Sequence, residues 1–367
     1  MMSKLAKNYP YVEVDLKKLK HNIDTVVGMC KEQGIGIAGV VKGFNGIPET
    51  LPLYQASDCT SIASSRLEHI EEAVNMGLGG PFMLIRIPMQ SEVPDLVRLA
   101  HISLNSEVSV LTAINEECKK QGKTHKVILM ADLGDLREGF WDEEELVQAA
   151  LFVENNLKNL TLEGIGTNLG CYGSIDATPE KMEELIQRAE AIEKAIGRRL
   201  NTISGGGTTS FPLVVRKTMP ARINHLRMGE GIALGKDLED IWGLDMSFLN
   251  KDVFTLRGEI IEIKDKPSYP VGDLFVDCFG NKGVYIDRGI RKRAILGMGK
   301  VDFCLDSQLE PRLPGVEVLG SSSDHLIVDI EECKENLKVG DILEFDLRYS
   351  TMVFLTGSRY VRLEIKG

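Results

Sequence analysis

The sequence has 367 residues, 43% of them hydrophobic and 26% charged, with a formal net charge of -11. This composition describes an ordinary soluble protein, the length favours two domains, and the acidic balance argues against nucleic acid or an anionic membrane as partner. The seven cysteines form no Cys-x-x-Cys pair, and no stretch has the apolar length of a signal peptide or a membrane span. We therefore expect a cytoplasmic protein with reduced thiols, and we predict no metal site.

The chain begins with a strand pattern and a helix pattern. Residues 9–16, YPYVEVDL, alternate in polarity, and residues 15–34 repeat apolar side chains at helical spacing. The early strand cannot be a ninth strand of a closed barrel. We therefore expect residues 1–14 to provide a strand that pairs with the C-terminal part of the chain.

Short apolar runs then alternate with helical patterns. Eight runs are expected to be strands: residues 36–42, 59–65, 81–88, 101–106, 126–134, 160–169, 200–207 and 223–229. Most are nearly continuous apolar runs, as expected for parallel strands that are covered on both faces. Eight strand-helix units predict a (β/α)8 barrel over residues 15–240, and a doubly wound open sheet is the alternative.

One helix between these strands has clear end signals. Thr178 stands where an N-cap is expected, Pro179 would occupy the first helical position, and Gly197 follows the last apolar repeat. The pattern changes after about residue 245, where segments such as KVGDILEFDL alternate with period two and long helical patterns disappear. We expect residues 241–367 to form a mostly β domain.

The active site of a barrel lies at the carboxyl ends of its strands. Lys42, Arg137 and Asn168 stand at three of these ends. The loops SGGGTTS (204–210) and RMGEG (227–231) follow the last two strands, where barrels often bind a phosphate. Glycines let backbone N–H groups approach an anion closely. A flexible turn is the plainer reading of three glycines, but the position of the two loops favours phosphate binding.

A lysine across from a phosphate site suggests pyridoxal 5'-phosphate, because its amine can form a Schiff base with the cofactor aldehyde. Alone, Lys42 could equally be a strand-end lysine that reaches solvent.

Five motifs carry a resemblance to a known family. YVEVDLKKLKHNI, VVKGFNG, DLGDLREGF, GIGTNL and LRMGEGIALG together resemble the alanine racemase family of fold-type III enzymes. SGGGTTS, RAILGMGKVD and LGSSSDHLIVDI look closer to its alanine/ornithine racemase branch.

The resemblance implies a role for each matching residue. Lys42 would hold the cofactor and act as one base, Arg137 would lie near the phenolic oxygen, and Asn168 would take the place of a histidine near the ring. Arg227 would face the pyridine nitrogen, which an always-charged arginine does not protonate, so that proton exchange at Cα is favoured over transamination. The phosphate would be bound by Ser204, Thr208, Gly229, Glu230 and Tyr349.

The pattern departs from the family where a second base is needed. Racemisation needs an acid/base group on each face of Cα, and Phe279 stands where the family has a tyrosine. The flanking residues Asp277 and Cys278 are our first candidates for this base, with Tyr269 and Tyr285 nearby. Ser323, Asp324 and His325 match a segment expected near the substrate carboxylate, although they could also form a simple solvated turn.

Two further departures concern the substrate. Met130 replaces a lysine that some alanine racemases carbamylate to brace the arginine, and Gly46 replaces an aromatic residue four positions after the lysine. A roomier pocket would suit a basic amino acid such as ornithine. We therefore predict a two-base amino-acid racemase, and the resemblance implies a homodimer in which the partner's C-terminal domain completes the site. A non-catalytic carrier of pyridoxal phosphate, a decarboxylase and a D-amino-acid aldolase remain the alternatives.

Overall fold

The computed structural model describes residues 9–367, which divide into two compact units. Residues 19–249 form one unit, and residues 250–367 together with residues 9–18 form the other. The barrel unit therefore extends beyond residue 240, the boundary expected from the sequence. Its last segment packs on the first helix, where His21 Nε2 bonds the carbonyl of Phe248 at 2.9 Å.

Eight parallel strands close into a barrel, which confirms the predicted fold and excludes the open sheet. Each strand pairs with the next along the chain, and β2 pairs with β9 to close the ring. The strands are β2 (Gly36–Val40), β3 (Ser61–Ser64), β4 (Phe82–Leu84), β5 (Ile102–Asn105), β6 (His125–Met130), β7 (Leu160–Gly166), β8 (Thr202–Ser204) and β9 (His225–Met228). Each of the eight predicted runs overlaps one of these strands.

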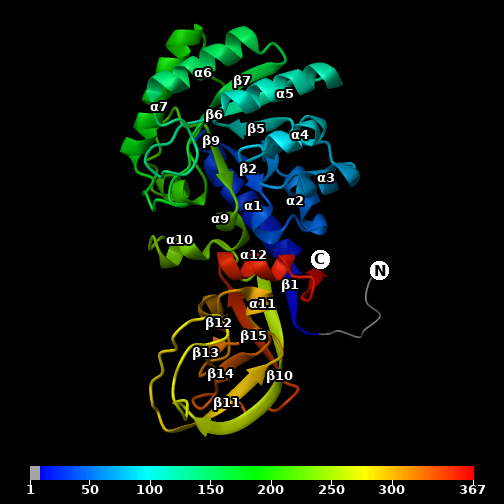
Figure 1. The fold of residues 1–367 in the computed structure, drawn as a ribbon, viewed down its shortest axis with the longest axis vertical. Coiled ribbons are helices and arrows are strands. Elements are labelled where there is room, and N and C mark those ends of the chain that lie inside the picture. Colours follow the sequence, from blue (N-terminus) through cyan, green and yellow to red (C-terminus); the bar gives the residue numbers. More distant parts are fainter. Residues whose placement is uncertain (1–8) are drawn as a thin grey trace. The chain divides into compact units, whose positions relative to one another are not determined.

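Helices follow the strands and cover the outside of the barrel (Figure 1). They are α1 (Leu16–Lys31), α2 (Leu51–Gln55), α3 (Leu67–Asn75), α4 (Val93–Leu99), α5 (Val108–Gln121), α6 (Glu143–Asn156), α7 (Pro179–Ile196), α8 (Phe211–Val215), α9 (Glu230–Ala233) and α10 (Lys236–Asp240), with short 3-10 turns η1 (Lys42–Phe44), η2 (Pro48–Thr50), η3 (Gln90–Glu92) and η4 (Thr208–Ser210). The predicted ends of α7 are confirmed: Thr178 accepts a hydrogen bond from the Lys181 N–H, and Gly197 caps the helix with φ of 75°.

Apolar side chains fill the inside of the barrel. One buried cluster joins five neighbouring strands and consists of Ala38, Val40, Ala63, Met83, Leu104, Ile128 and Met130. Such a barrel is a packed core and not a pore, so ligand chemistry is confined to the strand ends.

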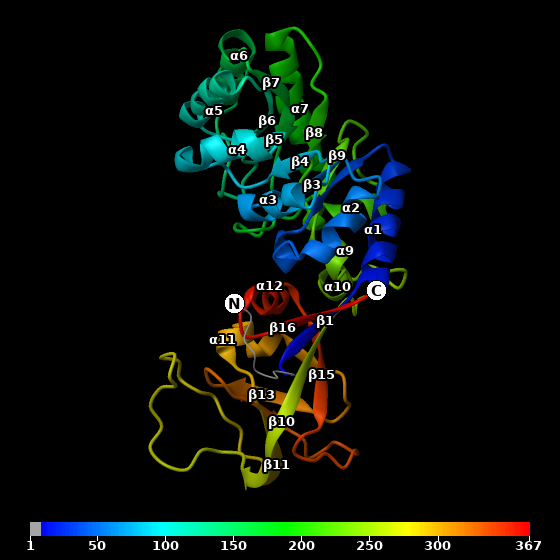
Figure 2. The same cartoon turned by 90° about the vertical axis from the view of Figure 1, so that its right-hand side faces the viewer.

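The second unit is a mostly antiparallel sheet in the order β12-β15-β10-β11-β14-β13. Strand β1 (Tyr11–Asp15) joins it, antiparallel to β10 and parallel to β16 (Figure 2). The other elements are β10 (Phe254–Pro267), β11 (Ile290–Leu296), α11 (Lys300–Phe303), η5 (Asp306–Gln308), β12 (Leu309–Pro311), β13 (Glu317–Ser321), β14 (Leu326–Asp329), β15 (Ile342–Leu347), α12 (Tyr349–Gly357) and β16 (Arg362–Lys366).

A long arm joins β10 to β11, and residues 271–289 of this arm are exposed throughout. Several of its exposed side chains are large and apolar, including Val271, Phe275, Val284 and Ile286. Within residues 9–367, none of the helices combines the length and the apolar character that a membrane crossing requires.

Candidate active site

Lys42 lies at the carboxyl end of β2, where the chain turns at once into η1. The turn is tight, since Asn45 and Gly46 both adopt positive φ and their N–H groups donate to the carbonyls of Lys42 and Val41. Burial is the main cause that lowers the pKa of Lys42; the charge of Cys171 opposes it, the charges of Arg137 and Arg227 lower the pKa further, and Glu138 raises it slightly. The described part of the chain offers the Lys42 ammonium no hydrogen bond or ion pair. A half-buried amine of this kind is suited to covalent or base chemistry.

Arg227, on the neighbouring strand β9, is only 6% exposed. Its guanidinium donates from Nη1 to Ser204 Oγ at 2.7 Å and from Nη2 to the Thr167 carbonyl at 2.8 Å. Burial lowers its pKa to about 10, far above neutral pH, so the group stays charged. No carboxylate among residues 9–367 forms an ion pair with Arg227, and Glu138 acts on its charge only through space.

The Ser204 hydroxyl has a different environment from the one expected for a phosphate ligand. It is fully buried, and it contacts both Arg227 Nη1 and His225 Nδ1, the latter at 2.9 Å. Burial and the neighbouring Arg227 lower the pKa of His225 to about 3, so the imidazole is neutral. These contacts favour a second role for Ser204, that of orienting Arg227, and the expected phosphate contact stays a prediction.

The two glycine loops instead offer backbone N–H groups. Those of Gly207, Thr208 and Thr209, at the start of η4, have no acceptor among the described residues. Thr208 Oγ1 accepts from the Gly231 N–H at 3.0 Å and so ties the loop after β8 to the loop after β9. A Cβ on Gly207 would lie 3.0 Å from the Arg227 carbonyl oxygen, a tight contact, so the close approach of the two loops favours glycine.

These residues fit pyridoxal phosphate, the cofactor that the resemblance implies. The side-chain nitrogen of Asn168 is buried, and no acceptor for it is found in residues 9–367. The free N–H groups suit a phosphate, and the buried charged donor Arg227 suits a ring nitrogen. Lys42, Arg137, Asn168, Thr208 and Arg227 all belong to the barrel unit, as do Gly229 and Glu230 at the start of α9.

One organising residue was missed by the sequence analysis. Asp135 is 1% exposed, and its carboxylate accepts from the N–H groups of Gly170 (2.9 Å), Tyr172 (3.2 Å) and Gly173 (3.1 Å). It thereby shapes the loop after β7, which carries the exposed Cys171. Asp135 ends the segment DLGD and directly follows a predicted strand, and this position was a signal that it organises a loop. The N–H groups that it binds could not be predicted, because they are 35 or more residues away in sequence.

Gly46, where the family has an aromatic residue, has φ of 59° and lies against His69. A Cβ there would be 2.8 Å from the His69 ring. His69 itself bonds Ser64 Oγ at 2.9 Å, at the end of β3. This side of the barrel mouth is therefore formed by a histidine from α3 in place of the aromatic residue.

The remaining predicted site residues belong to the C-terminal unit. Asp277 and Cys278 lie in the exposed arm, and Tyr349 is the first residue of α12. Ser323, Asp324 and His325 form the turn between β13 and β14, where the Ser323 hydroxyl donates to Asp324 at 2.7 Å. This is also the geometry of a simple capped turn.

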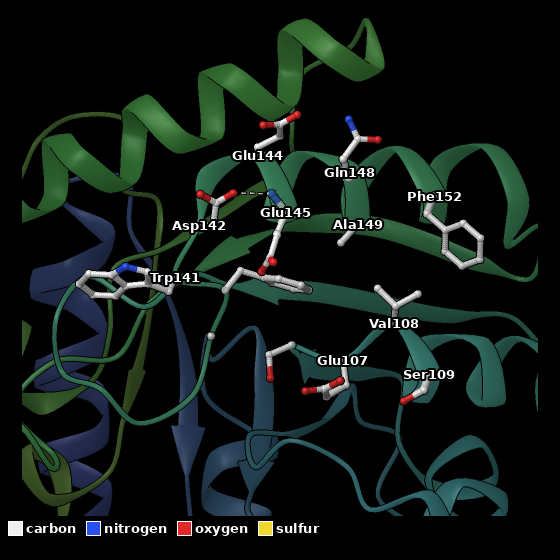
Figure 3. A pocket seen from close by; sticks show the side chains of 13 residues that line it. Glu107, Val108, Ser109, Trp141, Asp142, Glu144, Glu145, Gln148, Ala149 and Phe152 are labelled. Carbon is white, nitrogen blue, oxygen red and sulfur yellow. Dashed lines mark hydrogen bonds between the residues drawn. The ribbon is translucent and has the colours of Figure 1, made fainter.

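A separate cavity of about 980 Å³ lies beside the start of α6 (Figure 3). Trp141 and Phe152 mark opposite ends of it, Glu107 and Ser109 come from the start of α5, and Asp142 caps α6 by accepting from the Glu145 N–H. None of the predicted site residues lines this cavity. It is therefore distinct from the site around Lys42.

Comparison with known proteins agrees with this geometry. The model of the alanine racemase N-terminal domain matches residues 14–236. An ornithine racemase from Acetoanaerobium sticklandii is 38% identical over 97% of this chain and 99% of its own length. A lysine racemase from Thermotoga maritima is 37% identical over 96% of this chain and 97% of its own length.

Solved structures give the same fold. An alanine racemase from Streptomyces lavendulae superposes with a TM-score of 0.76 at 15% identity, over 99% of this chain and 98% of that one. The family resemblance inferred from the motifs is therefore confirmed, and the chain belongs to the alanine racemase family.

Proposed function

We propose that this chain is a pyridoxal-phosphate-dependent racemase of a basic amino acid, and ornithine and lysine are the substrates to test first. The family and the two nearly full-length relatives make it an amino-acid racemase. The alanine racemases among its curated relatives match less than half of the chain at 25% identity, which supports a basic substrate.

The observation that carries the proposal is that Lys42 follows β2 and that Arg227, which is buried and has no ion-pair partner among residues 9–367, lies on the adjacent strand β9. Bound pyridoxal phosphate would supply an aldehyde that a lysine amine can hold and a conjugated ring that withdraws electrons from the Cα of an amino acid. Lys42 would hold the cofactor and move one proton at Cα, helped by a lowered pKa that favours its neutral amine. Arg227 would donate a hydrogen bond to the ring nitrogen without giving up a proton.

The N–H groups of residues 207–209, with the Thr208 hydroxyl and the backbone of Gly229 and Glu230, would bind the phosphate. Asn168 would donate its unused amide proton to the cofactor. Arg137 would bind an anionic oxygen of the cofactor or the substrate, and Tyr349 would add a further phosphate contact.

The second base is proposed to come from the arm after β10. Backbone N–H groups of Asn281 (2.8 Å) and Phe279 (2.9 Å) donate to Asp277 and lower its pKa, which argues against Asp277 as a proton donor at neutral pH. Tyr269 directly follows Ser268, which is fixed by bonds to Gly289 and Arg293, and its ring packs edge-on to Tyr285. Tyr269 and Cys278 are therefore the stronger candidates.

An exposed arm rich in apolar side chains supports a homodimer in which the arm of one subunit covers the barrel mouth of the other. Light scattering should give twice the molar mass of the chain. Phe275→Ser with Val284→Ser should return the protein to monomers, whereas a monomeric wild-type protein would contradict this part of the proposal.

The test of the reaction is proton exchange. With cofactor present, the protein should show a visible absorption band, and NMR in deuterated water should show loss of the Cα proton of ornithine or lysine together with formation of the other enantiomer. Lys42→Ala should lose both signals. A variant without the second base should still exchange the Cα proton of one enantiomer with solvent but should no longer interconvert the two enantiomers. Testing Tyr269→Phe and Cys278→Ala should show which of these residues is the second base. A carrier would show the band without exchange, and a decarboxylase would release carbon dioxide.

A further inference from the structure

Arg137 and Glu138, in the loop after β6, form a two-pronged ion pair. The Glu138 carboxylate accepts from both Nε and Nη2 of Arg137, the second at 2.6 Å. This arrangement fixes the plane of a guanidinium, because two parallel hydrogen bonds permit only one orientation. It leaves the Nη1 edge of Arg137 without a partner among the described residues. The side chain of Glu138 is 16% exposed and that of Arg137 is 38% exposed, so solvent screens part of the attraction between them.

The backbone that carries this pair is held on both sides. Asp132 Oδ1 accepts from the N–H groups of Gly134 (2.9 Å) and Leu136 (3.1 Å), and Leu136 adopts a φ of 55°. Gly139 has φ of 130°, and a Cβ there would lie 2.5 Å from the Asp132 nitrogen. The loop therefore has little freedom to turn Arg137 and Glu138 elsewhere.

The charges of Arg137 and Glu138 act on the two other cationic side chains of the site, Lys42 and Arg227. The groups that act on Lys42 are Cys171 in the loop after β7, Arg137 and Glu138 in the loop after β6, and Arg227 on β9. Glu138 also acts on Arg227 and favours its charged form, whereas Arg137 opposes it. Glu138 is the one carboxylate among the groups that act on both cations.

We propose that Glu138 is the positioning residue of this site. It holds Arg137 so that the Nη1 edge is left for an anionic group, and its charge offsets the repulsion that Arg137 would exert on Lys42 and Arg227. Met130 cannot hold Arg137 in place of Glu138, because its side chain is fully buried in the barrel core and carries no charge. That Arg137 binds an anionic ligand rests on the proposed function. The effect of the Glu138 charge on Lys42 and Arg227 does not rest on it.

The test uses the full-length protein without cofactor. Glu138→Gln keeps the shape of the side chain, removes its charge and leaves one acceptor oxygen. Competitive acetylation at a series of pH values, followed by mass spectrometry of the peptide with Lys42, measures the titration of that amine. We expect Glu138→Gln to shift the pKa of Lys42 further down, and Arg137→Gln with Glu138→Gln to move it back toward the wild-type value.

A matched control is available on the outside of the barrel. Glu154 accepts from Nε (2.8 Å) and Nη2 (2.7 Å) of Arg198 in the same two-pronged way, and neither residue is among the charges that dominate the pKa shift of Lys42. Glu154→Gln should leave the Lys42 titration unchanged. Glu138→Asp keeps the charge and should rescue the titration even if its shorter side chain breaks one hydrogen bond.

An unchanged Lys42 titration in Glu138→Gln, or a double variant that behaves like Glu138→Gln alone, would overturn the proposal. Because no cofactor or substrate is present, this outcome is independent of the racemase proposal. In the loaded enzyme, Glu138→Gln should lower kcat and shift its pH profile, whereas a purely structural loss would follow the thermal stability of the protein.

Discussion

Ser204→Ala separates two roles for a residue at the end of β8. If the hydroxyl binds a phosphate, its removal should weaken cofactor binding and leave the cofactor-free protein nearly as stable as before. If it orients Arg227, as its contacts indicate, its removal should destabilise the cofactor-free barrel.

The expected loss comes from two broken contacts. The hydrogen bond from the charged Arg227 contributes about 1.5 to 3 kcal/mol, and the buried His225 nitrogen left without a partner costs about 1 to 3 kcal/mol. Both groups are less than 10% exposed, so water cannot replace the lost hydroxyl. We expect the free energy of unfolding to fall by about 3 to 5 kcal/mol.

The two tryptophans provide the assay. Trp141 and Trp242 both belong to the barrel unit, so their fluorescence during urea denaturation reports the unfolding of the barrel separately from the β domain. Ser210→Ala is the matched control, because Ser210 Oγ is also fully buried but donates to a neutral carbonyl, that of Gly205, at 2.6 Å. Its loss should cost only about 1 kcal/mol. Equal effects of the two variants, or a Ser204→Ala loss below about 1 kcal/mol, would refute the orienting role.

Two other predictions concern the same barrel. Asp135→Asn replaces an acceptor of three N–H groups with an amide that has one acceptor oxygen, so residues 170–173 should lose protection in hydrogen exchange, and unchanged protection would contradict the bracing role. Burial lowers the pKa of His125 to about 4 and that of His225 to about 3. Unfolding raises both toward 6.5, so the unfolded state binds more protons below pH 6.5 and stability should fall by roughly 1.4 kcal/mol per pH unit for each histidine down to about pH 4. A flat tryptophan-monitored stability profile between pH 6.5 and 4 would show that these histidines are not buried in the neutral form.

The barrel and the positions of Lys42 and Arg227 were predictable because they follow from local patterns. Continuous apolar runs indicate covered parallel strands, and a charged residue near the carboxyl end of such a run lies near the mouth. The helix α12 was not predicted, because YSTMVFLTG is apolar on all sides and rich in strand-forming residues. The partners of Ser204 were not predictable either, because they are set by lateral strand neighbours and not by residues adjacent in sequence.

The charges at the barrel mouth explain why this site suits a highly anionic ligand. Arg137 and Arg227 both lower the pKa of Lys42, and Arg137 opposes the charged form of Arg227, whereas the Glu138 carboxylate favours the charged forms of Lys42 and Arg227. Burial lowers the pKa of Lys42 and of Arg227, so each charge weakens the folded state until an anion arrives. A ligand that binds only the folded protein adds RT ln(1 + [L]/Kd) to its stability, about 4 kcal/mol at a thousandfold excess over Kd. A dianionic phosphate should therefore stabilise the barrel more at low salt than at high salt, whereas a ligand held only by apolar contacts would show no such dependence.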